Sequence, residues 1–266
     1  MNSQSRTPLE IYKLLPKTNC GKCLLPSCLA FAAAVVAGGK KLSDCPDLAP
    51  QHRTALSAQA PKTDQREREQ VELIATLQGT MAAIDFEKVA PLIGATVKGD
   101  RLVINSLGKD FMVDRQGNLT SECHIIPWIQ APILSYISNP MHGDITGRWI
   151  AFRDLEGGLD WQGLFNSRCE TPLRRLADDN PHLLADLIDL FMGRTIDWYE
   201  ADIALILHPL PKVPILICYQ APEDDLESTL TIFFDACCGV NLPIRSLFGL
   251  CAGLVHMFTK IAAHHS

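Results

Sequence analysis

Residues 18–28, TNCGKCLLPSC, place three cysteines within nine residues, and a fourth follows in the stretch KKLSDCPDL. Cys20, Cys23, Cys28 and Cys45 together form the pattern C-x2-C-x4-C-x16-C. The chain has ten cysteines and begins with the polar residues MNSQSRTPLE, so we expect no signal peptide and a cytoplasmic protein. Because thiols stay reduced in that compartment, metal binding, catalysis or plain burial is expected rather than a disulfide framework.

Local geometry allows the four thiols to meet at one centre. Gly21 permits a tight turn between the first two cysteines, and the amides of such a turn can point at thiolate sulfur. Pro26 suits the first position of a helix, which is predicted to continue through the alanine-rich run and to end at Gly38-Gly39. Cys28 then lies in the first turn, where the helix dipole favours an anion. The helix carries the chain outward by about 18 Å, and the extended return to Cys45 spans about 20 Å.

Three neighbouring thiols and one remote thiol favour a 4Fe–4S cluster. Zinc sites with four cysteines usually pair two C-x2-C knuckles, whereas neighbouring thiols can hold three corners of a cubane that a distant cysteine closes. Pro46 follows Cys45, as in the C-P ending of ferredoxin runs. A zinc site and four unligated thiols remain as alternatives. Lys17 and Lys22 flank the first two cysteines, where they can dock an acidic redox partner or rest against the protein's own acidic body.

Residues 8–48, PLEIYKLLPKTNCGKCLLPSCLAFAAAVVAGGKKLSDCPDL, resemble the N-terminal iron–sulfur domain of the corrinoid iron–sulfur protein large subunit and the related domain of Rnf-complex B subunits. The resemblance implies that Cys20, Cys23, Cys28 and Cys45 bind a low-potential 4Fe–4S cluster, which in the corrinoid protein supports reductive reactivation of cobalt. The 266 residues do not accommodate both the barrel and the corrinoid-binding domain of that protein. The D-x-H-x-x-G pattern of corrinoid-binding domains is also absent.

Composition and charge exclude several classes of protein. With 47% apolar and 20% charged residues, the chain is typical of a globular protein. Residues 1–45 carry six basic side chains against two acidic ones, so they contribute +4 and the remainder −10 to the net charge of −6. We therefore expect no nucleic-acid binding by the whole chain. The C-terminal apolar run is interrupted by His256 and Lys260, which favours a core helix over a membrane span.

The remaining residues predict one further domain, 63–266, after a cluster domain and linker at 1–62. Helices are predicted at 63–78 (with Thr63 or Asp64 as N-cap), 85–95, 127–138, 171–180, 182–193 and from Pro243 onward. An antiparallel meander is predicted at 101–107, 110–114 and 119–123, with turns at Gly108-Lys109 and Gln116-Gly117-Asn118. Residues 201–210, 213–220 and 229–237 are predicted to add strands to the same sheet. The fold class is α+β: a small helical iron–sulfur lobe plus a larger domain with a mainly antiparallel sheet covered by helices.

The body also resembles a known family. The stretches GRWIAFRDLEGG (147–158), PLPKVPILICY (209–219) and FFDAC (233–237) are similar to a domain-of-unknown-function family from anaerobic bacteria and archaea, sometimes fused to such a cluster domain. The resemblance covers most of residues 65–262 and implies no activity. The body lacks G-x-G-x-x-G, G-x-x-x-x-G-K-[ST], H-E-x-x-H, C-x3-C-x2-C and G-x-S-x-G, which disfavours nucleotide-driven and hydrolytic chemistry.

Few side chains of the body suggest a site, and no catalytic residue is assigned. Its six cysteines lack ligand spacing and are expected to be buried, although the pair Cys237-Cys238 could meet a metal or a partner's cluster. Arg148 and Arg153 lie near aromatic residues and could bind an anion, but ion pairs with acidic side chains such as that of Asp154 are favoured.

The last predicted helix has small residues on one face. Gly249, Gly253, His256 and Lys260 line the face opposite the leucines. The two glycines permit the close approach of another element or of a flat ligand. His256 alone is weak evidence for a metal ligand.

Three functions are compatible with this sequence. The leading hypothesis is a one-electron carrier or reductive-activation accessory for a corrinoid or other low-potential enzyme of anaerobic metabolism, working with a redox partner protein. The second is an iron–sulfur enzyme that acts on a small anionic substrate bound by the C-terminal domain. The third is a binding or sensing module in which the cluster is structural.

Overall fold

The computed structural model of the protein describes residues 8–36, 40, 42–48, 62–123, 125–180, 182–197, 199–224 and 226–265. The chain divides into two compact units, residues 1–72 and 73–266, and the division falls within helix α4 (Lys62–Met81). Because α4 begins at Lys62, neither Thr63 nor Asp64 is its N-cap. Most of the predicted linker, residues 49–61, lies outside the described residues, and the predicted domain boundary after residue 62 stays a prediction.

The first unit is built on helices α1 (Pro8–Leu14) and α2 (Cys28–Val36) and the short 3-10 helix η1 (Leu42–Asp44). Helix α1 was not predicted; it packs on α2 and contributes Ile11 to an apolar cluster around Phe31. Helix α2 begins two residues after the predicted Pro26, because the Ser27 hydroxyl accepts the Ala30 amide (3.1 Å) and caps the helix. The predicted helix end, Gly38-Gly39, lies outside the described residues.

The second unit opens with helix α5 (Phe86–Ile93) and the predicted meander. Strands β1 (Thr96–Lys98), β2 (Arg101–Ser106), β3 (Lys109–Val113) and β4 (Leu119–Thr120) form an antiparallel sheet in that order, and β1 was not predicted. The β2–β3 turn lies at Leu107-Gly108, one residue earlier than predicted. Both residues have positive φ (+51° and +78°), as two-residue hairpins of this kind require.

The later strands form a sheet of their own, so the prediction of a single sheet is wrong. Strands β5 (Trp149–Ala151), β9 (Thr229–Asp235), β8 (Val213–Gln220), β7 (Ile203–Leu210) and β6 (Arg194–Thr195) pair in this order, all antiparallel. The two sheets meet where the β7–β8 register shifts, near Pro209. There the Leu107 amide and the Ser106 hydroxyl donate to the carbonyls of His208 and Pro209 (3.1 and 2.7 Å). Because Pro209 has no N–H to donate, the hydrogen bonds between the two sheets do not continue as a β-ladder beyond this point.

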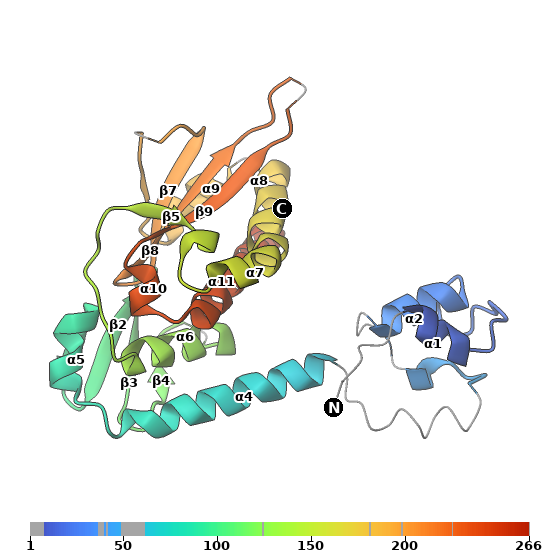
Figure 1. Cartoon of the computed structure of the whole chain (residues 1–266), viewed down its shortest axis with the longest axis horizontal. Helices are drawn as coiled ribbons and strands as arrows, with labels where there is room; N and C mark the ends of the chain where they lie inside the picture. Colours follow the sequence, from blue (N-terminus) through green and yellow to red (C-terminus); the bar gives the residue numbers. More distant parts are fainter. Residues whose placement is uncertain are drawn as a thin grey trace. The chain divides into compact units, whose positions relative to one another are not determined.

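Helices cover one face of the five-stranded sheet (Figure 1). Besides α5 and the last part of α4, the helices of this unit are α6 (Pro127–Ser138), α7 (Gly158–Phe165), α8 (Thr171–Asp179), α9 (Leu183–Leu190), α10 (Cys238–Asn241) and α11 (Ile244–His265), with a 3-10 turn η2 (Phe152–Asp154) and a π-helical turn η3 (Asn166–Glu170). Because strand side chains alternate, Ile215 and Ile217 of β8 enter the main core, while Leu216 and Cys218 face the other side. The predicted α+β class is confirmed.

Helix α11 is the core helix that the sequence favours. Within the described residues, Ile244–Ala263 is the stretch that is long and apolar enough to cross a membrane by length and composition. Its buried side chains, however, belong to the main core, among them Leu247, Leu250, Leu254 and Phe258. A buried helix of a globular domain passes the same length test, so this finding is weak evidence for a span.

Candidate metal centre

The first two cysteines lie in a loop with an unusual backbone. Lys17, Asn19, Gly21 and Leu24 all have left-handed φ values, between +48° and +71°. The predicted turn at Gly21 is present, because the Leu24 amide donates to the Gly21 carbonyl (2.9 Å). Left-handed residues at short intervals turn backbone amides toward a common side, a conformation that suits an anionic ligand.

The structure brings the four cysteines into one small region. Cys23, Cys28 and Cys45 are buried in the same apolar cluster, whereas Cys20 is exposed. The Cys20 thiol reaches the Asp47 carboxylate (3.7 Å), two residues beyond Cys45. The chain therefore returns from α2 to the first cysteines, as the predicted geometry requires.

Asn19 fixes the third cysteine in place. Its side-chain oxygen accepts the Cys28 amide (2.8 Å), and its own amide donates to the Cys28 sulfur (3.4 Å). Cys28 is the first residue of α2, so its sulfur lies at the positive end of the helix. Sequence reasoning missed Asn19, although asparagine is among the residues that tolerate the left-handed conformation it adopts here (φ +48°).

Burial favours the neutral form of the Cys45 thiol, and an ion pair lies nearby. Burial raises the pKa of Cys45, and the nearby Cys23 and Cys28 thiols raise it further. A bound metal removes the proton of a coordinating thiol outright, so this set of donors suits a cationic metal. Lys22 donates to both oxygens of Asp47 (3.1 and 2.9 Å), and this hydrogen bond raises the pKa of Lys22 and lowers that of Asp47. The role of Asp47 was also not predicted.

The thiols are not packed around the position of one ion. Among the residues that the structure describes, no three His, Cys, Asp or Glu side chains gather closely enough to hold a single metal ion. Four sulfurs around one zinc lie about 3.8 Å apart, because each Zn–S bond is about 2.3 Å. In a cubane each cysteine binds a separate iron, which spreads the sulfurs more widely.

The cysteines of the second unit are mostly buried, as expected. Five of the six are buried, and Cys123 is half-buried. Burial raises the pKa of Cys169 to about 12. The thiols of Cys237 and Cys238 donate to the carbonyls of Lys212 and Pro214 (3.5 and 3.4 Å). Buried, hydrogen-bonded thiols of this kind are typically inert.

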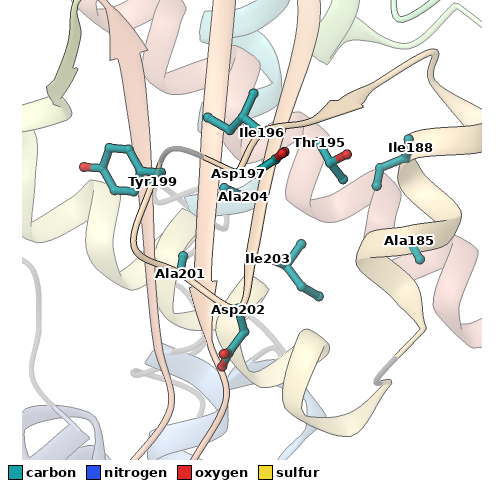
Figure 2. A pocket seen from close by; sticks show the side chains of 10 residues that line it. All are labelled: Ala185, Ile188, Thr195, Ile196, Asp197, Tyr199, Ala201, Asp202, Ile203 and Ala204. Carbon is teal, nitrogen blue, oxygen red and sulfur yellow. The ribbon is translucent and has the colours of Figure 1, made fainter.

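The arginines Arg148 and Arg153 are not among the residues that line the pocket described below. Both are exposed, and Arg153 lies 3.9 Å from Asp154, the kind of ion pair that was favoured. A pocket of about 420 Å³ lies instead beside α9 and the segment from β6 to β7 (Figure 2). Its charged lining residues are Asp197 and Asp202, which Figure 2 shows well separated from each other. A pocket with carboxylates and no cation does not suit an anionic substrate.

Two family models match this chain. The family described as "Putative Fe-S cluster" matches residues 15–46, and the "Domain of unknown function (DUF3786)" matches residues 85–257. No solved structure matches the chain.

Relatives of known name match the N-terminal region. The corrinoid/iron–sulfur protein large subunit of Moorella thermoacetica is 52% identical over 54 residues, which are 20% of this chain and 12% of that protein. Subunit gamma 1 of the acetyl-CoA decarbonylase/synthase complex of Methanosarcina thermophila is 49% identical over 49 residues, 18% of this chain and 10% of that subunit. The chain thus spans about a tenth of the length of these relatives.

These matches confirm both resemblances seen in the sequence. The N-terminal region is an iron–sulfur cluster region homologous to those of the corrinoid/iron–sulfur protein and the gamma subunits. Since the second family model covers more than half of the chain, the protein belongs to the DUF3786 family.

Proposed function

We propose that the protein is an electron-transfer protein in which Cys20, Cys23, Cys28 and Cys45 hold one 4Fe–4S cluster. The observation that carries the proposal is the placement of these residues: three share one apolar cluster, and Asp47 ties the fourth to the chain beside Cys45. When bound, such a cluster supplies one-electron chemistry at low potential.

The arrangement of the thiols supports a cluster over zinc. Zinc sites with four cysteines usually pair two C-x2-C knuckles, whereas this chain has three neighbouring cysteines and a fourth after sixteen intervening residues. One amide of the loop with left-handed residues, that of Asn19, donates to the Cys28 sulfur, and hydrogen bonds to sulfur tune iron–sulfur clusters.

In this proposal, residues around the cysteines shield the cluster from water and stabilise its negative charge. Phe31 and Leu48 are buried beside the cysteines and exclude water. The Asn19 amide stabilises negative charge on the Cys28 sulfur. Lys22 lies close enough to influence Cys20 and Cys45 electrostatically, and a nearby cation favours the more negative, reduced cluster.

The relatives indicate the kind of client. One relative is named as a corrinoid/iron–sulfur protein and others as subunits of an acetyl-CoA decarbonylase/synthase complex. We infer that this chain, too, works with protein partners and delivers single electrons to a corrinoid protein or another low-potential enzyme of anaerobic metabolism. In this proposal the second unit binds the partner protein or a cofactor.

Metal and sulfide analysis is the first test. In full-length protein purified without oxygen we expect about four iron and four acid-labile sulfide per chain. One zinc and no sulfide per chain would identify the N-terminal region as a structural zinc site and would contradict the proposal. Reversible reduction in a redox titration is expected as well; a cluster that cannot be reduced would be a structural one.

A matched pair of cysteine variants tests the ligands. Cys23→Ala is expected to abolish the electron paramagnetic resonance signal of the reduced cluster and the reduction of a Co(II) corrinoid protein. Cys169→Ala removes a buried cysteine of the second unit and is expected to leave both unchanged. All four tryptophans lie between residues 128 and 198, so tryptophan fluorescence reports whether the second unit remains folded in each variant. Corrinoid reduction that survives in Cys23→Ala would contradict the proposal.

A further inference from the structure

Two exposed leucines lie directly beside predicted cluster ligands. Leu24 follows Cys23 and is 84% exposed, and Leu29 follows Cys28 and is 47% exposed. Consecutive Cα atoms are about 3.8 Å apart, so both leucines lie next to thiols that would bind the cluster. The two cysteines are buried, whereas the leucines that follow them are left in water.

Leu24 lowers the stability of this unit in two ways. Its φ of +64° lies in the left-handed region, where a side chain is strained and glycine is favoured. The hydrogen bond from its amide to the Gly21 carbonyl holds it in this conformation. Burial does not offset the strain, because the side chain is almost fully exposed. Strain of this kind, combined with an exposed apolar side chain, is typical of a residue that serves a contact outside its own core.

The charge around these leucines is positive. Residues 8–48 contain five lysines against Glu10, Asp44 and Asp47, in a chain whose net charge is −6. Lys13, Lys17 and Lys22 are exposed. Lys22 pairs with Asp47, and Lys17 lies over the Tyr12 ring (5.7 Å), so both side chains are held near the loop. Such a surface attracts an acidic protein and repels a basic one.

We propose that Leu24 and Leu29 form the apolar centre of a docking surface for an acidic iron–sulfur electron-transfer protein. The positive charge of the lysines attracts the partner, and the two leucines form the apolar contact from which water is excluded. One electron passes between the partner's cluster and this protein's cluster; no covalent bond forms or breaks and no proton is required. This inference rests on the proposed function and names the partner of that same site.

Stopped-flow electron transfer tests the proposal. An acidic two-cluster bacterial ferredoxin, reduced beforehand, is mixed with oxidised full-length protein, and the second-order rate constant is measured at several salt concentrations. For the wild type we expect a rate constant that falls with rising salt. Leu24→Gly removes both the apolar side chain and the strain, and we expect it to lower the rate constant by about tenfold. Its thermal stability should stay the same or rise, because glycine suits the left-handed conformation.

The control is Leu159→Ala, which removes a leucine of similar exposure (74%) from the second unit and should leave the rate constant unchanged. Iron and sulfide content and the midpoint potential must match in all three proteins. Suppose that a small viologen reduces the cluster of Leu24→Gly normally and that this variant also exchanges electrons with ferredoxin as fast as the wild type. The proposed docking surface would then be contradicted, while the electron-carrier function would stand.

A second outcome would also overturn the proposal. If sedimentation shows that Leu24→Gly converts a dimer into a monomer, the leucines contact a second copy of the chain and not a ferredoxin.

Discussion

Asp235 shows how one carboxylate organises a loop of the second unit. It is fully buried at the end of β9, and its oxygens accept the amides of Thr146, Gly147 and Cys237 and the hydroxyl of Thr146, at 2.6–3.1 Å. Burial alone raises the pKa of this carboxyl, but the hydrogen bonds from Cys237 and Thr146 outweigh it, and the pKa is lowered from its ordinary value of 3.8. The charged form thus holds the segment before β5 against β9.

Asp235→Asn is expected to destabilise the second unit. The amide cannot accept all of these hydrogen bonds, so buried N–H groups lose partners, at a cost of about 3 kcal/mol. Tryptophan fluorescence in a urea titration measures the free energy of unfolding of this unit. The control Asp154→Asn removes an exposed carboxylate and should change that free energy by less than about 0.5 kcal/mol. Equal effects of the two substitutions would contradict this role for Asp235.

The same carboxylate predicts an acid dependence of stability. Because the folded pKa is below the unfolded one, the contribution is complete above pH 3.8 and is lost as the pH falls from there toward the folded pKa. The wild type should therefore lose more stability than Asp235→Asn over this range. Urea titrations at a series of pH values, followed by tryptophan fluorescence, test this expectation, and parallel curves for the two proteins would contradict it.

At the scale of the elements, the contact between α6 and α11 explains one predicted pattern. The sequence indicates that Gly249 and Gly253 permit a close approach to the last helix, and the structure separates their roles. A Cβ atom at Gly253 would lie 2.7 Å from the Cβ of Trp128 in α6. At Gly249 an added Cβ would meet nothing within 4 Å. Only Gly253 is therefore required by helix packing.

A matched pair of glycine substitutions tests this difference. Gly253→Ala forces α6 and α11 apart and is expected to cost about 1–3 kcal/mol. Gly249→Ala meets no obstacle and should stabilise α11 by up to about 1 kcal/mol, because alanine favours the helix. Chemical denaturation followed by far-ultraviolet circular dichroism measures both changes. Stabilisation by both substitutions would show that the packing at Trp128 is loose.

At the scale of the whole molecule, the two units differ in how they are stabilised. Among the described residues of the first unit, nine form its buried core, and three of them are the proposed ligands Cys23, Cys28 and Cys45. A core this small does not stabilise a domain without a metal or a cross-link. The second unit has a large continuous core and needs no such support.

Removing the cluster should therefore unfold one unit and spare the other. After treatment with a chelator and an oxidant, residues 8–48 are expected to lose protection from hydrogen exchange, because metal binding and folding are coupled in small domains. The unfolding transition reported by tryptophan should stay unchanged. Mass spectrometry of exchanged peptides resolves the two regions, and full protection of residues 8–48 in the apoprotein would contradict the expectation.

The sequence by itself determined the features that depend on local order along the chain. The spacing of four cysteines, the turn at Gly21 and the periodicity of most helices and strands follow from neighbouring residues, and they indicated both the iron–sulfur region and the α+β class. Tertiary structure decided what depends on residues far apart. It divided the strands into two sheets that meet at Pro209, brought Asp47 to Cys20, buried Asp235 against Thr146, and left Arg148 and Arg153 outside the pocket. Such contacts join segments that the sequence separates by up to 103 residues, and only packing of the complete chain selects them.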